Sequence, residues 1–126
     1  MGRVLIVDDE PPLLKMMSIY LQRKGHSVTT CSSTDDAAAK VEASPAEFDV
    51  AVLDATMDGL SMEELALRLL KANAALRVLA ASGYPVDTSA LEAAAPGRVA
   101  FLLKPFSPEM LASEVGRMLG EKEKDL

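Results

Sequence analysis

The chain has 126 residues, 49% of them hydrophobic and 25% charged, which is the composition of one globular domain and not of a disordered tail. Its 13 basic and 19 acidic residues give a formal charge of −6, which argues against direct binding of nucleic acid or of an anionic membrane. One cysteine excludes an internal disulfide, and no apolar run approaches the ~20 residues that span a bilayer. We therefore expect a soluble cytoplasmic domain over residues 1–120, followed by a charged tail over residues 121–126.

Five short segments have the composition of β-strands. Four of them are nearly continuous apolar runs, which are typical of parallel strands covered on both faces. The second, Ser27–Cys31, is more polar and suits the edge of a sheet. The predicted strands cover residues 3–7, 27–31, 48–53, 76–81 and 99–103.

Helical periodicity and capping signals lie between these strands. Gly25 is expected to end the first helix, and Thr34 to cap the second. Ser61–Glu64 forms a capping box at the start of the third. Ser107 and Pro108 suit the N-cap and first turn of the last helix.

A weaker helix is predicted over residues 87–95. It is rich in alanine and should be loosely held, because Leu91 is its only large apolar residue. The chain therefore alternates strand and helix five times. This order predicts an α/β fold, a doubly wound parallel sheet of five strands with five helices and right-handed crossovers.

Acidic residues follow two of the predicted strands. Asp8, Asp9 and Glu10 follow the first strand, and Asp54 ends the third. One aspartate at a strand end is an ordinary solvated turn former. Several carboxylates at converging strand ends would repel one another unless a cation joined them. A donor set made only of oxygen suits Mg²⁺, so the sequence predicts a magnesium site at this edge.

Ser82 and Lys104 end the fourth and fifth strands and add a hydroxyl and an ammonium group to the same edge. A cis Lys104–Pro105 bond would fix the direction of the lysine. This set suits phosphoryl transfer, since an aspartate can attack phosphorus and cationic groups stabilise the developing charge. No histidine is expected at this edge, because His26 is interpreted as an exposed loop residue.

Four motifs in this order resemble the receiver domains of two-component response regulators: Val7–Glu10, Val52–Met57, Ala81–Tyr84 and Leu103–Phe106. The resemblance covers roughly Arg3 to Leu119 and implies a flavodoxin-like (CheY-like) sheet of strand order 2-1-3-4-5. The stretch from Phe101 to Leu111 is most similar to receivers of hybrid sensor histidine kinases.

The resemblance implies a role for each acidic residue. Asp54 would accept a phosphoryl group from a phosphohistidine on a sensor histidine kinase or a phosphotransfer domain. Asp9, Asp54 and the backbone carbonyl of Thr56 would bind Mg²⁺ directly, with Asp8 acting through water.

The resemblance also implies a switch. Lys104 would pair with the acyl phosphate, Ser82 would move toward it, and Phe101 would change rotamer with Ser82. The face formed by the fourth helix, fifth strand and fifth helix would then change for an output partner that the sequence does not name.

Two departures from the family pattern lie after the acceptor. Asp58 adds a negative charge, and Met62 stands where the family often has glycine. Glu10, Asp58 and Tyr84 are possible modulators. Tyr84 either gates access to the edge or packs on the surface, and Thr56 could influence the lifetime of the phosphate.

Two other functions fit parts of this pattern. A pseudo-receiver would be an interaction module that never takes phosphate, which the complete set of candidate residues disfavours. A haloacid-dehalogenase-type phosphatase would need a second aspartate where Thr56 stands. We expect a self-phosphorylating acceptor and not a turnover enzyme, although a longer parent chain could be a hybrid histidine kinase.

Overall fold

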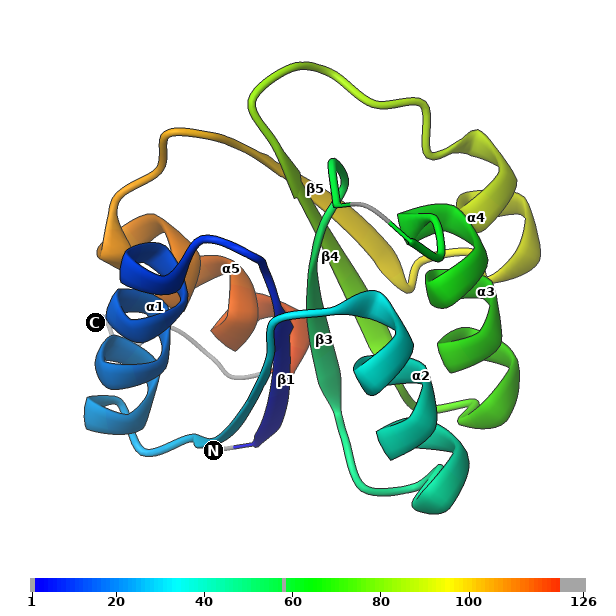
Figure 1. Ribbon diagram of the computed structural model, residues 1–126, viewed down its shortest axis with the longest axis horizontal. Helices are drawn as coiled ribbons and strands as arrows, with labels where there is room; N and C mark the ends of the chain where they lie inside the picture. Colours follow the sequence, from blue (N-terminus) through cyan, green and yellow to red (C-terminus); the bar gives the residue numbers. More distant parts are fainter. Residues whose placement is uncertain (1, 58, 121–126) are drawn as a thin grey trace.

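Strands and helices alternate along the computed structural model, which describes residues 2–57 and 59–120 (Figure 1). Predictions about Asp58 and the tail lie outside the described residues. The strands are β1 (Arg3–Val7), β2 (Ser27–Cys31), β3 (Val50–Asp54), β4 (Arg77–Ser82) and β5 (Val99–Leu103). The helices are α1 (Pro11–Arg23), α2 (Thr34–Ala43), α3 (Met62–Ala72), α4 (Ser89–Ala94) and α5 (Pro108–Met118).

The five strands form one parallel sheet in the order β2-β1-β3-β4-β5, as predicted. The polar strand β2 lies at an edge, and β1 lies beside β3. Helices α1 and α5 cover one face, and α2, α3 and α4 cover the other (Figure 1). The carboxyl ends of β1 and β3 are therefore adjacent, which is the arrangement that the proposed acidic site requires.

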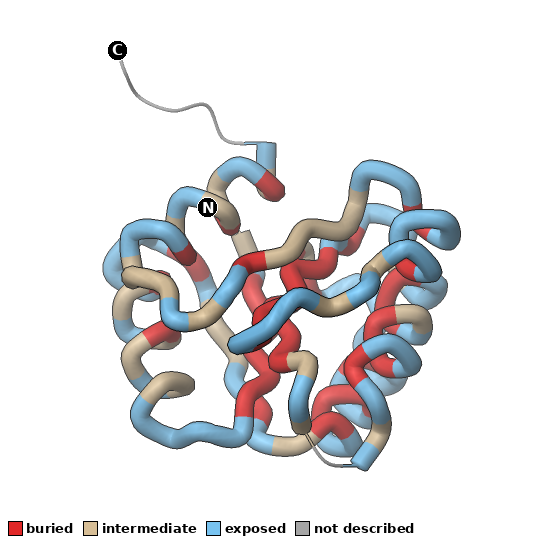
Figure 2. Tube along the Cα trace, turned by 90° about the horizontal axis from the view of Figure 1, so that it is seen from above, coloured by how far each residue is buried: buried red, intermediate tan, exposed pale blue. Residues whose placement is uncertain are grey.

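Two apolar clusters hold the helices against the sheet. Because side chains alternate along a strand, Leu5 and Val7 of β1 pack in one cluster, and Val4 and Ile6 pack in the other. The central strands are buried along their length, whereas the helices expose their outer faces (Figure 2). None of the helices in the described parts of the chain is long and apolar enough to cross a membrane.

Side-chain caps define three helix starts. Ser61 accepts a hydrogen bond from the Glu64 amide, and Ser107 accepts one from the Met110 amide, as predicted. The predicted cap at Thr34 is wrong by one residue. Ser33 has the extended backbone of an N-cap and accepts from the Asp36 amide, so Thr34 is the first helical residue.

Helix α4 is shorter than the predicted 87–95. Asp87 lies before the helix, where its carboxylate accepts a hydrogen bond from the Ser89 amide. Leu91 is the buried residue of α4. One buried side chain gives little packing energy, which agrees with the expectation of a loosely held helix.

Candidate functional site

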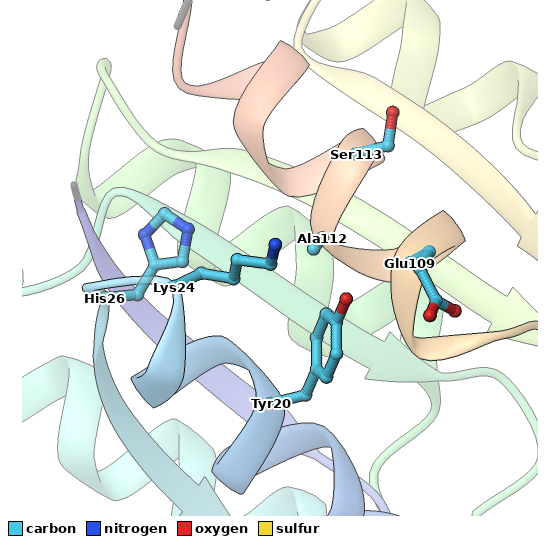
Figure 3. Close-up of a pocket in the computed structure, with 6 residues that line it drawn as sticks. All are labelled: Tyr20, Lys24, His26, Glu109, Ala112 and Ser113. Carbon is cyan, nitrogen blue, oxygen red and sulfur yellow. The ribbon is translucent and has the colours of Figure 1, made fainter.

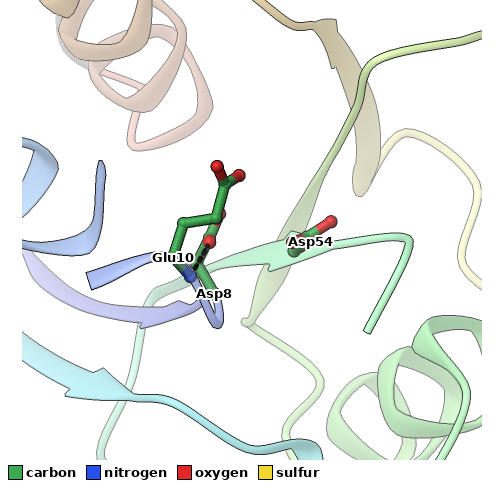
Figure 4. Close-up of side chains that lie close together, drawn as sticks. All are labelled: Asp8, Glu10 and Asp54. Carbon is green, nitrogen blue, oxygen red and sulfur yellow. Dashed lines mark hydrogen bonds between the residues drawn. The ribbon is translucent and has the colours of Figure 1, made fainter. Parts of the chain in front are cut away.

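Three carboxylates meet at the carboxyl edge of the sheet (Figure 4). Asp8 follows β1, Asp54 ends β3, and Glu10 reaches the site from the turn before α1. One oxygen from each lies within 4.8 Å of the others. Asp8 and Asp54 are buried and Glu10 is exposed, so two of the three charges have lost most of their hydration.

Lys104, directly after β5, faces all three carboxylates. Its Nζ lies 3.1 Å from Asp8 Oδ2 and 3.6 Å from Asp54 Oδ2. It also lies 3.3 Å from Glu10 Oε1. The Lys104–Pro105 peptide is cis.

The charges at this edge shift two pKa values. Burial raises the pKa of the Asp8 carboxyl, although hydrogen bonds from the Glu10 amide and from Lys104 act in the opposite direction. Burial alone would lower the pKa of Lys104. The hydrogen bond and charge of Asp8 act in the opposite direction, with help from Asp54 and Glu10, and the net effect is a raised pKa of Lys104. The lysine therefore stays cationic.

Thr56 orients the Asp54 carboxylate. Its amide donates to Asp54 Oδ1 at 3.0 Å, and its hydroxyl donates to the same oxygen at 2.9 Å. The other oxygen, Oδ2, is the one nearest Lys104. The two oxygens therefore differ, because Oδ1 is held by neutral donors and Oδ2 faces a cation.

Ser82 is fully buried at the end of β4, where its Oγ accepts from the Tyr84 amide at 3.2 Å. Its backbone carbonyl accepts from the Lys104 amide at 2.7 Å, which ties the ends of β4 and β5 together. Phe101 is half-buried and packs on the cluster beneath α3 and α4. Tyr84 is 59% exposed, as expected of a surface turn aromatic.

Two described residues, Gly59 and Met62, shape the chain between Asp54 and α3. Gly59 has a φ of +89°, a conformation that glycine adopts without strain. Met62 begins α3 and is buried in the core, so it packs where a glycine would leave space.

Sequence reasoning assigned Asp9 to the metal and treated Glu10 only as a modulator. The structure instead gathers Glu10 with Asp8 and Asp54, and it leaves Asp9 exposed. The sequence offered no signal to choose Glu10 over Asp9, because the two acids are neighbours that both follow β1. The role of Asp9 stays a prediction.

The residues at this edge fit a hard divalent cation. All three side chains donate oxygen, and one lysine does not balance three negative charges. Mg²⁺ prefers such oxygen ligands and accepts one or two carboxylates.

His26 does not lie in an exposed loop, so that prediction is wrong. It is 7% exposed, and its Nδ1 accepts a hydrogen bond from the Gly2 amide at 3.1 Å. Burial follows because the turn between α1 and β2 packs against the chain that enters β1. His26 also lines a cavity of about 310 Å³ between α1 and α5 (Figure 3), which shares no residue with the carboxylate cluster.

Two curated proteins resemble nearly the whole chain. The alginate biosynthesis transcriptional regulatory protein AlgB of Pseudomonas aeruginosa is 33% identical over 119 residues, which are 94% of this chain and 26% of that protein. The sensor kinase CckA of Brucella abortus is 31% identical over 120 residues, which are 95% of this chain and 13% of that protein. The chain thus spans a small part of each relative's length.

Solved structures share the fold. Chemotaxis protein CheY4 of Vibrio cholerae has a TM-score of 0.79 and 29% identity, covering 94% of this chain and 98% of that chain. Response regulator TrrA of Thermotoga maritima, in complex with Mg(2+)-BeF, has a TM-score of 0.78 and 27% identity, covering 94% and 99%. Residues 4–116 match the sequence model of the response regulator receiver domain. The chain therefore belongs to the response regulator receiver domain family of two-component systems.

Proposed function

We propose that Asp54 is the phosphoacceptor of this receiver domain, which extends over residues 1–120. The observation that supports this assignment is the juxtaposition of a buried aspartate with a lysine whose Nζ lies 3.6 Å from Asp54 Oδ2. Attack by one Asp54 oxygen on the phosphorus of a phosphohistidine forms the acyl phosphate bond. The phosphorus–nitrogen bond breaks, and the imidazole leaves with the electron pair and takes up a proton.

The residues around Asp54 divide the work of the transfer. Thr56 holds Oδ1 with two hydrogen bonds, which orients the carboxylate. Lys104 pairs with the phosphoryl oxygens as their charge develops, and Ser82 hydrogen-bonds the product. Asp8, Asp9 and Asp54, with the Thr56 carbonyl, would hold Mg²⁺, with Asp8 acting through water. The bound ion would neutralise charge on the phosphoryl oxygens.

The donor is a sensor histidine kinase or a phosphotransfer domain, and the chain works in the cytoplasm without binding nucleic acid. Phosphorylation changes the face formed by α4, β5 and α5. The hydrogen bond from the Lys104 amide to the Ser82 carbonyl supports this route, because movement of either residue pulls on the other strand end. The sparsely buried α4 is the element that such a pull displaces most easily.

Labelling with acetyl phosphate tests the acceptor. In the presence of Mg²⁺, intact-mass measurement should show the addition of one phosphoryl group, which hydroxylamine removes as expected for an acyl phosphate. Asp54→Asn and chelation of Mg²⁺ should each abolish the signal, and labelling of the Asp54→Asn chain would overturn the assignment. Steady release of phosphate from a phosphoester would instead favour a phosphatase, and a chain that binds Mg²⁺ without taking phosphate would favour a pseudo-receiver.

Magnesium titrations of Asp8→Asn, Asp9→Asn and Glu10→Gln test the ligand set. Loss of affinity in Asp9→Asn supports its place in the site, whereas unchanged affinity removes it from the set.

A further inference from the structure

Lys104 is held by three acids that differ in how easily they can release it. Asp8 and Asp54 have side chains that are 3% and 2% exposed, whereas the Glu10 side chain is 62% exposed. A carboxylate at the surface regains its hydration when an ion pair opens, but a buried carboxylate does not. Glu10 is therefore the partner that Lys104 loses at the lowest cost.

The start of α1 leaves the Glu10 side chain available for this contact. Glu10 is the N-cap residue of α1, yet its side chain makes no capping hydrogen bond. Pro11 and Pro12 occupy the first two helical positions and carry no amide proton, so fewer amides are left for a side chain to cap. The Glu10 amide donates instead to Asp8 Oδ1 at 2.8 Å, which fixes its backbone over the site.

There is room for Glu10 to move away. Glu10 and Lys104 both line an open cavity of about 450 Å³, together with Leu13, Pro105 and Phe106. The Glu10 carboxylate can therefore leave Lys104 without displacing packed side chains.

An ammonium group has three hydrogen-bond donors and no acceptor. In this structure Lys104 directs hydrogen bonds to Asp8 and Glu10 and forms an ion pair with Asp54. A phosphoryl oxygen on Asp54 would compete with these acceptors for the same ammonium group, and the exposed Glu10 yields most easily.

We propose that Glu10 is a positioning residue that holds Lys104 in the unphosphorylated domain and competes with the phosphoryl group for it. Glu10 thereby lowers the affinity of the site for the phosphoryl group. This regulation rests on the proposed function, because it concerns the lysine that would bind the phosphoryl oxygens.

Beryllofluoride binding at saturating Mg²⁺, followed by fluorine NMR, tests the proposal. Glu10→Gln should bind the analogue about two- to five-fold more tightly, the range for an exposed ion pair. Glu10→Asp keeps the charge but shortens the reach to Lys104, so it should also bind more tightly. Glu47→Gln removes the same charge from an exposed site before β3 and should match wild type. Unchanged or weaker binding by Glu10→Gln would overturn the proposal.

A Lys104→Ala background separates release of the lysine from simple charge removal. The gain from Glu10→Gln should largely disappear in that background, because no lysine remains to be freed. A gain of equal size with and without Lys104 would mean that Glu10 acts only through its charge, which refutes the positioning role.

A measurement without any phosphoryl analogue tests the contact itself. Acylation of lysines in the metal-free chain, read by peptide mass spectrometry, should be faster at Lys104 in Glu10→Gln than in wild type, with Lys15 and Lys71 as internal references. An equal rate would contradict the hold on Lys104. If no chain binds beryllofluoride, the proposed function fails and the release step fails with it, whereas faster acylation would still establish the contact.

Discussion

Replacement of Lys104 by methionine removes the cation that faces three carboxylates while keeping an unbranched side chain of similar length. At an effective dielectric constant of about 20, a separation of 3.1 Å from Asp8 corresponds to about 5 kcal/mol of attraction. Desolvation of the lysine offsets much of this energy. Removing one partner of a buried ion pair typically costs about 3–5 kcal/mol. We expect about 3 kcal/mol here, because the lysine side chain is 17% exposed and Asp8 can take up a proton.

The assay is urea and thermal unfolding followed by circular dichroism, first with a chelator and then with Mg²⁺. For a chain of this length the loss corresponds to a fall in Tm of roughly 10 °C. Mg²⁺ at about 100 times its dissociation constant adds about 2.7 kcal/mol to the free energy of unfolding. At equal Mg²⁺ concentration the gain should be larger in Lys104→Met than in wild type, because the ion supplies the missing positive charge.

Lys15→Met is the matched control. Lys15 is exposed on α1, so its replacement should change the free energy of unfolding by less than about 0.5 kcal/mol. A Lys104→Met chain as stable as wild type without metal would refute the electrostatic reasoning. The same conclusion would follow if Mg²⁺ stabilised the two chains equally.

Four further variants test the pH dependence and the core. Burial raises the pKa of Asp8 in the folded chain, so keeping this carboxyl ionised at neutral pH lowers the free energy of unfolding. This loss of stability disappears as the pH falls through the raised pKa and Asp8 takes up a proton. Asp8→Asn should therefore be more stable than metal-free wild type at pH 7 in urea unfolding, with the difference shrinking toward pH 4. The hydrogen bond from Arg3 lowers the pKa of Asp49 in the folded chain. The ion pair between Arg3 and Asp49 therefore stabilises the fold above about pH 3.9, and this stabilisation is lost as the pH falls below that value. Asp49→Asn should cost less than about 1 kcal/mol at pH 7 and nothing near pH 2, and a constant cost would contradict the ion pair. Leu79 lies in the fully buried part of β4, so Leu79→Ala should lower the free energy of unfolding by about 2–5 kcal/mol in the same assay. Leu103 on β5 is 49% exposed, so Leu103→Ala should lower it by less than about 1 kcal/mol. Equal losses would contradict the assigned burial.

Much of the fold could be predicted because its signals are local. Continuous apolar runs indicated buried parallel strands, and serines before helical segments indicated caps that reach three residues ahead. The cap at α2 was missed by one residue because Ser33 and Thr34 are adjacent and both can cap. Their backbone conformations decide between them, and composition does not carry that information.

The burial of His26 could not be predicted from its position. It follows a helix-ending glycine, where loops are usually exposed. Its burial depends on the Gly2 amide, which lies 24 positions earlier in the chain. Contacts of this kind form only when β1 and β2 pair.

The sequence by itself determined the chemical content of the site: an aspartate after β1, another at the end of β3, a serine at the end of β4 and a lysine after β5. Strand ends place such residues at one edge whatever the details of packing, because parallel strands share their direction. Only the tertiary structure decided which carboxylates meet. Asp9 and Glu10 are neighbours in the chain and both are exposed, yet the path into α1 brings Glu10, and not Asp9, to Asp8, Asp54 and Lys104. The backbone direction before α1 and the contact with Lys104, 94 positions away in the chain, decide which acid joins the site. A local sequence pattern contains neither piece of information.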